Sequence, residues 1–455
     1  MLREPRGPEK KVSVHPVLPP ELLQFLNRRS YSLLIKGEAA TGKTILALSI
    51  LKELGDVSNY LYLSTRVSPS QLFENHPWLS ELVKARKPES GEDAKRGRIQ
   101  DRFVDARLDE PVPFFERMTN ELMDVRSPTI VVDTWDPIGT MMEDDALLSN
   151  TKVLQTWRER AEAKLIVLIE DSANNTFDSL FDGVVAMDRY YEEGRIVRMV
   201  HLSKLSGVKV NRPSPLFTLD ESVFQSFRTY RPLDIDAQKP ASWAWERRAR
   251  STGYRELDAA FDGTLPSGTI MHLNVNSGVN SRMVLLLLSG IIGRGDSRSR
   301  AILFRPFEGI GLEQARGAFG EATPIVRARL RGKNGSGDAE TWAKTLKGMV
   351  KKQKEARKEK RLVVATGSEL LLDAGGEEEV EDLLELMKSE IDLSVIVTGS
   401  GNQLEKAARV ADVSLRLSDI NGTPLLEGEL PWTEYFGITA KARNGGLALG
   451  LVPMV

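Results

Sequence analysis

The sequence predicts an α/β fold with two tandem domains, each holding a mostly parallel sheet covered by helices on both faces. Short apolar runs alternate with helical patterns along the chain, which is typical of parallel sheets. The chain has 455 residues, which is too many for one ordinary core and suggests two domains of about 200 residues each. We therefore expect one domain over residues 1–230, a linker over 231–252 and a second domain over 253–455.

Composition narrows the class of protein. The formal net charge is −2, so the overall charge does not point to a nucleic-acid or membrane partner. The chain has no cysteine, which excludes disulfides, thiolate metal sites and cysteine catalysis, and its four histidines are scattered. The longest apolar run, residues 283–292, is about half as long as a membrane span, and residues 1–20 lack the apolar core of a secretory signal. We expect a cytoplasmic protein without a membrane partner.

One motif organises the first half of the chain. Residues 37–44 match the pattern G-x-x-x-x-G-K-[ST] without a mismatch. An apolar run precedes them and a helical pattern follows, which is the strand, loop and helix that a phosphate-binding loop requires. The alternative is a tight glycine turn that binds no ligand. The predicted nucleotide-binding residues are Gly37, Glu38, Ala39, Ala40, Thr41, Gly42, Lys43 and Thr44.

The chemistry of this motif predicts ATP with Mg²⁺ as the ligand. Glycines allow backbone N–H groups to turn toward an anion, and the N-terminus of the following helix adds the positive end of its dipole. Lys43 would contact the β- and γ-phosphates, and the hydroxyl of Thr44 would ligate Mg²⁺. Residues 128–133 form a second apolar run that ends in an acid, so Asp133 is the other predicted metal ligand. Further strands are expected at residues 33–36, 59–64, 164–171 and 183–187.

Several segments of the first half resemble a known family. Tyr60–Leu72, the strand that ends in Asp133, Asp188–Tyr190 and Arg195–Gly207 are similar to the KaiC-like branch of the RecA superfamily. With the opening Pro19–Leu23, they are most similar to the archaeal gas-vesicle regulatory protein D group. The resemblance covers nearly the whole chain and implies two RecA-like P-loop domains. It also implies either a hexameric ring or a monomer in which the second domain takes the place of a neighbouring subunit.

The segment after the second strand departs from the family pattern. KaiC-like ATPases usually carry Ser-x-Glu-Glu there, and a glutamate polarises the attacking water; this chain reads Ser64-Thr65-Arg66-Val67. A cation cannot act as that base, so we expect ATP binding with slow hydrolysis. Glu170, Asp171 or Asp136 is the remaining candidate for positioning the water.

A second departure concerns contacts between subunits. The family's Lys-x-Arg-Gly segment, whose basic residues reach a neighbouring subunit's phosphate, is Lys204-Leu205-Ser206-Gly207 in this chain. Only Lys204 could supply that contact, and a solvated lysine at a strand end is the alternative. The predicted catalytic residues are Lys43, Asp133, Glu170 and Lys204.

The second half repeats the pattern without its charges. Ser251–Asp258 and Leu265–Ile270 resemble the start of a KaiC-like domain, but Ser281 stands at the position of the loop lysine. The candidate metal strand, residues 362–366, ends in Thr366 rather than in an acid. We expect a degenerate domain, a pseudo-ATPase that binds a partner or braces the first domain. Its strands are expected at residues 301–304, 362–365, 394–398 and 413–417.

Charged and aromatic segments leave alternatives open. Residues 84–107 and 344–361 are rich in basic side chains, and residues 377–392 are mostly acidic. We interpret the first as a solvated, partly helical excursion and the other two as solvated helix faces, with binding of nucleic acid or of an acidic partner as the alternative. Trp243 and Trp245 in the linker are expected to dock on a domain surface rather than stack on bases.

Three functions are compared. The preferred one is a regulatory nucleotide switch that acts on a protein partner, because slow hydrolysis and a degenerate second site suit a switch better than a motor. The alternative is a DNA-acting RecA-family ATPase for recombination, repair or unwinding. Residues 134–150 and 171–182, which would line a DNA path, contain no basic residue, so DNA is possible but not favoured. A metabolic kinase would need an acceptor pocket and a base that the sequence does not reveal.

Overall fold

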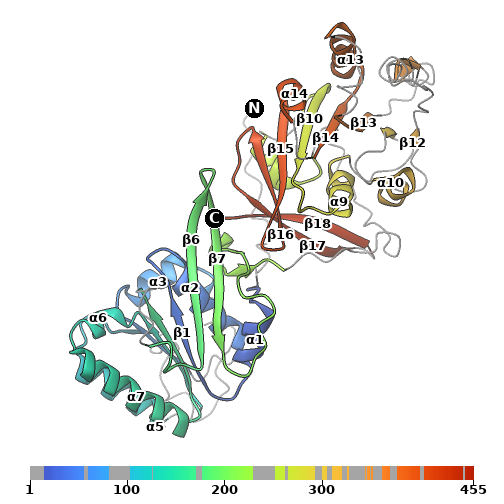
Figure 1. Ribbon diagram of the computed structural model, residues 1–455. Coiled ribbons are helices and arrows are strands. Elements are labelled where there is room, and N and C mark those ends of the chain that lie inside the picture. Colours follow the sequence, from blue (N-terminus) through green and yellow to red (C-terminus); the bar gives the residue numbers. More distant parts are fainter. Residues whose placement is uncertain are drawn as a thin grey trace, which may run out of the picture. The chain divides into compact units, whose positions relative to one another are not determined.

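The computed structural model divides into two compact units, residues 1–227 with residue 455, and residues 228–454 (Figure 1). Each unit holds one sheet of mostly parallel strands flanked by helices, which confirms the predicted α/β class. The described residues are 15–55, 60–80, 103–124, 127–170, 177–228, 252–261, 265–292, 300–304, 310–319, 325–326, 344, 346–348, 350–351, 361–368, 377–399, 404–443 and 446–455.

The first unit is built on a seven-stranded sheet in the order β3-β2-β4-β5-β1-β6-β7. Neighbouring strands are parallel except for β6 and β7, which form a long antiparallel hairpin, green in Figure 1. The strands are β1 (Tyr31–Lys36), β2 (Tyr60–Ser64), β3 (Phe103–Asp105), β4 (Thr129–Asp133), β5 (Lys164–Ile169), β6 (Gly183–Glu192) and β7 (Arg195–Leu205). A separate pair, β8 (Phe217–Thr218) and β9 (Gln225–Ser226), lies outside this sheet, with a short 3₁₀ turn at Asp220–Ser222 between them.

Helices cover both faces of this sheet, so its central strands are buried. Every residue of β1, β2 and β4 is buried, as expected for parallel strands between two layers of helices. One core holds side chains of α1, α2 and α3, and the other holds side chains of α5, α6 and α7. The helices are α1 (Pro20–Leu26), α2 (Lys43–Leu54), α3 (Pro69–Asn75), α5 (Pro111–Asp124), α6 (Asp136–Gly139) and α7 (Asp144–Arg160).

The end of the basic segment 84–107 differs from the expectation of a solvated excursion. Phe103–Asp105 forms β3, which pairs with β2 at the edge of the sheet. The ring of Phe103 packs against Tyr60, Tyr62 and Phe73 with centroids 5.0–5.6 Å apart. Burial of this aromatic side chain explains the added strand, since apolar contact outweighs the charges around it. Residues 84–102 lie outside the described part of the chain.

The second unit repeats the strand order of the first. Its nine-stranded sheet runs β12-β11-β13-β14-β10-β15-β16-β17-β18, so its first seven strands follow the same crossover order as β3-β2-β4-β5-β1-β6-β7. The last three connections are antiparallel, and β16–β18 were not expected from the sequence. The strands are β10 (Thr269–Val275), β11 (Arg300–Phe304), β12 (Ile325–Val326), β13 (Arg361–Gly367), β14 (Leu393–Thr398), β15 (Val413–Ile420), β16 (Thr423–Leu430), β17 (Phe436–Arg443) and β18 (Gly446–Pro453).

The helices of the second unit account for two sequence features. The apolar run near residues 283–292 lies in α9, which is buried in the core, and no helix among the described residues is long and apolar enough to cross a membrane. The acidic segment forms α13, whose Glu381 and Glu385 are exposed while Met387 is buried, so the prediction of a solvated helix face is confirmed there. The helices are α8 (Arg255–Ala260), α9 (Ser281–Ile291), α10 (Leu312–Phe319), α13 (Glu377–Glu390) and α14 (Leu404–Val410).

The expected linker 231–252, with Trp243 and Trp245, lies outside the described residues except for its last position. The same holds for most of the basic segment 344–361. Three of its lysines are described, and Lys344, Lys347 and Lys351 are exposed.

Candidate nucleotide-binding site

The predicted phosphate loop lies between β1 and α2, at the edge where the parallel strands end. Gly37 has φ +156°, and a Cβ added to it would lie 2.4 Å from the carbonyl oxygen of Met187 on β6. Ala40 and Gly42 also have positive φ, 62° and 103°. The chain therefore passes so close to β6 at Gly37 that only glycine fits, and the loop curls tightly before α2 begins at Lys43.

Lys43 folds back across the loop that precedes it. Its Nζ donates to the carbonyl oxygens of Gly37 at 2.7 Å and of Glu38 at 2.8 Å, and the side chain is buried. Burial is the main cause that lowers the pKa of Lys43, and the negative charges of Asp133 and Asp136 oppose it. Both acceptors are neutral carbonyls, so an anionic phosphate would be a stronger partner for this ammonium.

The structure brings Thr44 and Asp133 together, as the metal prediction requires. Oδ2 of Asp133 accepts hydrogen bonds from the hydroxyls of Thr44 at 2.8 Å and Tyr62 at 2.5 Å. Burial raises the pKa of Asp133, while the hydrogen bonds from Tyr62 and Thr44 and the charge of Lys43 act against the rise. Hydroxyl and carboxylate oxygens suit Mg²⁺, which keeps water and phosphate oxygens as its other ligands. Among the described residues, no group of three or more His, Asp or Glu side chains forms a separate metal site.

Arg66 and Glu170 form an ion pair at the same edge. Arg66 follows β2, and its Nη1 donates to Oε1 of Glu170, which follows β5. The backbone N–H of Glu170 donates to both carboxylate oxygens of Asp136, at 3.0 and 3.1 Å. Two of the three acids proposed to position water are therefore engaged by other groups. The third, Asp171, lies outside the described residues.

Comparison with known proteins identifies the type of domain around this site. Residues 22–203 match the family model described as the P-loop domain of the GvpD gas vesicle protein. The first unit is similar to the P-loop domain of GvpD. Protein GvpD1 and Protein GvpD2 of Halobacterium salinarum are 28% identical over 286 residues and 25% identical over 278 residues to this chain. These matches cover 57% and 56% of the chain and 50% and 54% of the relatives, so the chain spans about half the length of the curated relatives it matches.

The side chain of Lys204 forms a hydrogen bond outside the phosphate loop. Its Nζ donates to the backbone carbonyl of Asp178 at 3.1 Å. The carboxylate of Asp178 accepts from Nζ of Lys36 at 2.9 Å with both oxygens, and Lys36 is buried directly before Gly37. Lys204 is therefore linked to the loop through Asp178 and Lys36, a pair that the sequence did not reveal.

Arg198 supports the loop and was not predicted. It is buried on β7, and its Nη1 donates to the carbonyl oxygens of Ala40 at 3.0 Å and Thr41 at 3.3 Å. Burial is the main cause that lowers the pKa of this guanidinium, and the nearby charge of Arg189 adds to it. No local sequence signal marks Arg198, because its contact with the loop depends on β6 lying between β1 and β7.

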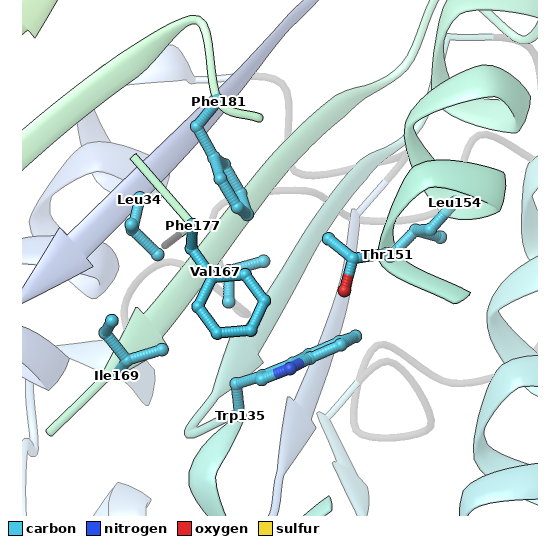
Figure 2. Close-up of a pocket in the computed structure, with 8 residues that line it drawn as sticks. All are labelled: Leu34, Trp135, Thr151, Leu154, Val167, Ile169, Phe177 and Phe181. Atoms are coloured by element: carbon cyan, nitrogen blue, oxygen red, sulfur yellow. The ribbon is translucent and has the colours of Figure 1, made fainter. Parts of the chain in front are cut away.

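An apolar cavity lies under this edge of the sheet but is too small for a substrate. Figure 2 shows Leu34, Trp135 and Phe177 among the side chains around it. Its volume is about 10 Å³, which leaves room for one water molecule at most. It therefore does not supply the acceptor pocket that a metabolic kinase would need.

The second unit has a loop at the corresponding position, between β10 and α9. Strand register aligns the two, since Lys36 pairs with the last residue of β5 and Asn274 with the last residue of β14. On this alignment Val275 replaces Gly37 and Ser281 replaces Lys43. The candidate metal strand was predicted to end at Thr366, but β13 continues to Gly367. Strand register places Gly367, not Thr366, at the position that corresponds to Asp133. In either case the carboxylate is missing.

Two backbone amides at the second loop donate hydrogen bonds to groups of the protein itself. The side chain of Asn280 accepts from the N–H of Arg282 at 2.8 Å, and the N–H of Asn276 donates to the carbonyl of Leu417 at 2.9 Å. A cavity of about 290 Å³ beside the loop is lined by Gly278 and the exposed acid Asp419. An acid at this place repels a phosphate, where the first loop supplies a lysine.

Proposed function

We propose that this protein is an ATP-binding regulatory switch that hydrolyses its nucleotide slowly. The observation that carries the proposal is the convergence of Lys43, Thr44 and Asp133 on one phosphate loop of a GvpD-like domain. These groups supply a cation for the phosphates and two oxygens for Mg²⁺. ATP with Mg²⁺ is the ligand that uses all three.

Slow hydrolysis follows from the groups that surround this loop. A general base must lie within hydrogen-bond reach of the attacking water and must have its charge available. The position after β2 is Arg66, a cation that cannot act as this base. The carboxylate of Asp136 already accepts hydrogen bonds from the backbone N–H of Glu170. Such a site favours long occupancy by ATP, which suits a switch.

The partner and the second unit complete the proposal. Because the matching family model is described as a gas vesicle protein, we propose that the switch acts on a protein partner in the gas vesicle system. The second unit acts as a pseudo-ATPase domain that binds this partner or braces the first unit, since its loop lacks the lysine and its strand lacks the acid. Hexamer and monomer remain the two assemblies to compare, by measuring mass in solution with and without ATP.

The proposal is tested by nucleotide binding and turnover on the wild type and on Lys43→Ala, with and without DNA. A charge-assisted hydrogen bond contributes about 1.5–3 kcal/mol, so Lys43→Ala should weaken ATP binding by about 10- to 100-fold. Lys152→Ala, on an exposed position of α7, is the matched control and should bind as the wild type does. Wild-type turnover should be slow and indifferent to DNA.

Two outcomes would contradict the proposal. Normal ATP binding by Lys43→Ala would contradict the assignment of the nucleotide site to this loop. Fast turnover that DNA stimulates would favour the alternative of a DNA-acting RecA-family ATPase.

A further inference from the structure

Four adjacent strands bring the charged groups of the first unit to one edge. In the order β2-β4-β5-β1, Arg66 follows β2, Asp133 ends β4, Glu170 follows β5, and the phosphate loop follows β1. The carboxyl ends of parallel strands meet at the same edge of a sheet, where ligands bind in open α/β folds. The Arg66–Glu170 pair therefore reaches across the end of β4, from the strand on its far side to the strand beside the loop.

Strand register fixes these positions more closely. Ser64 pairs with Asp133, so Arg66 stands two residues beyond the level of the metal-binding acid. Ile169 pairs with Lys36, so Glu170 stands level with Gly37, the first residue of the loop. Backbone hydrogen bonds keep the end of β2 in place, because the N–H of Thr65 donates to the carbonyl of Asp133 at 2.8 Å. The guanidinium is thus presented from a rigid strand end.

The charge of Arg66 affects the pKa values of two groups at the loop, Lys43 and Asp133. After burial and the opposing effects of Asp133 and Asp136, it is the remaining cause that lowers the pKa of Lys43. It also acts to lower the pKa of Asp133, after burial, the two hydroxyl hydrogen bonds and Lys43. Strand register places Arg66 two residues beyond the level of Asp133, which accepts a hydrogen bond from Thr44, so Arg66 follows β2 at the same edge of the sheet as Lys43. Both Arg66 and Lys43 are cations, and their charges are balanced by Asp133 and Glu170.

The ion pair is able to change partners. The side chain of Arg66 is 49% exposed and that of Glu170 is 34% exposed, so both can move through solvent. The backbone of Glu170 is held by Asp136, which keeps β5 in place while the carboxylate turns away. An exposed ion pair contributes only about 0–1 kcal/mol, whereas an arginine–phosphate pair is bidentate and charge-assisted. When a phosphate binds near Lys43, the guanidinium of Arg66 should therefore leave Glu170 and pair with the phosphate.

We propose that Arg66 is the residue of this chain that distinguishes ATP from ADP: it binds the γ-phosphate in cis and leaves Glu170 when it does so. The inference rests on the proposed function, since it requires that the loop hold a nucleotide. ADP leaves the Arg66–Glu170 pair intact because it lacks the γ-phosphate. The ion pair is then the contact that differs between the two nucleotide states, and its opening releases a carboxylate at the end of β5.

The test is the affinity for ATP and for ADP, each with Mg²⁺, measured for the wild type, Arg66→Ala, Glu170→Gln and the double variant. Arg66→Ala should weaken ATP binding by about 10-fold and leave ADP binding within about 2-fold. Glu170→Gln should strengthen ATP binding several-fold, since it removes the competitor for the guanidinium. In the Arg66→Ala background, Glu170→Gln should have no effect on ATP, because it acts only through the arginine.

The controls separate this inference from the proposed function. Arg107→Ala opens a comparably exposed ion pair with Asp105, just after β3, and should alter neither affinity. Equal loss of ATP and ADP in Arg66→Ala, or loss of neither, would overturn the role of Arg66. Normal binding of both nucleotides by Lys43→Ala would instead overturn the nucleotide site. Mass spectrometry or circular dichroism that shows an unfolded Arg66→Ala would transfer the test to Glu170→Gln, for which unchanged ATP affinity overturns the inference.

Discussion

The two loops of this chain have the same place in the same strand order, yet of the two only the first carries the lysine and the acid expected of a phosphate site. Both follow the strand that lies fifth in its sheet and both lead directly into a helix, α2 or α9. In the first, Lys43 spans the loop and Asp133 meets Thr44. In the second, an asparagine caps the helix and an acid lies beside the loop. The two loops therefore differ not in fold but in a few side chains and one glycine, and these are what the prediction of a nucleotide site depends on.

The largest effect is expected from a single methyl group at Gly37. Gly37→Ala is the smallest step toward Val275 of the second loop, and its Cβ would lie 2.4 Å from the backbone oxygen of Met187. Overpacking against backbone, together with an unfavourable φ, should destabilise the first unit by about 2–4 kcal/mol and abolish ATP binding. Chemical denaturation and nucleotide titration measure the two effects. Gly348→Ala is the control, because its Cβ would meet nothing within 4 Å.

A variant Gly37→Ala that is as stable as Gly348→Ala and still binds ATP would break the comparison. It would mean that the glycine is not what separates the two loops. The difference would then lie in Lys43 and Asp133 alone.

A smaller effect is expected from Arg198→Ala, which removes the support under the first loop. Arg198 donates to the carbonyls of Ala40 and Thr41, so its loss should let the loop relax and should weaken ATP and ADP by the same factor of about 10. Titration with both nucleotides distinguishes this from Arg66→Ala, which should affect ATP alone. Arg189→Ala, at an exposed position on β6, is the matched control. Selective loss of ATP in Arg198→Ala would contradict its role as a support.

These residues also mark how far the sequence predicted the site. The loop, the strand that ends in Asp133 and the meeting of Asp133 with Thr44 depend on local patterns and on one rule of parallel sheets, and all could be expected. Tyr62, Arg198 and the Arg66–Glu170 pair could not, because each contact joins segments whose distance depends on the strand order. The hydrogen bond from Lys204 to the carbonyl of Asp178 has the same origin, and the predicted contact of Lys204 with a neighbouring subunit's phosphate stays a prediction.

Errors in the fold have a similar origin. The strand expected to end at Thr366 continues to Gly367, because its end is set by pairing with β14 rather than by its own composition. Strands β17 and β18 were missed because their apolar residues alternate with polar or small ones, whereas the predicted strands are continuous apolar runs. The short strand β3 was not predicted because charged residues surround it in the sequence. The packing of Phe103 on β2, which the sequence does not show, explains why it is a strand.

The smallest effect is expected from restoring one charge to the second loop. Ser281→Lys, made in a Lys43→Ala background so that the first site is silent, should gain no measurable ATP binding. The reasons are structural: Val275 stands where Gly37 is required, the amides of Arg282 and Asn276 are already used, and Asp419 faces the loop without a metal-binding acid opposite. Isothermal titration with ATP and Mg²⁺ measures it, and Lys43→Ala alone is the control. If the lysine did restore binding, a single charge would account for the difference between the loops, and the glycine and the acid would be secondary.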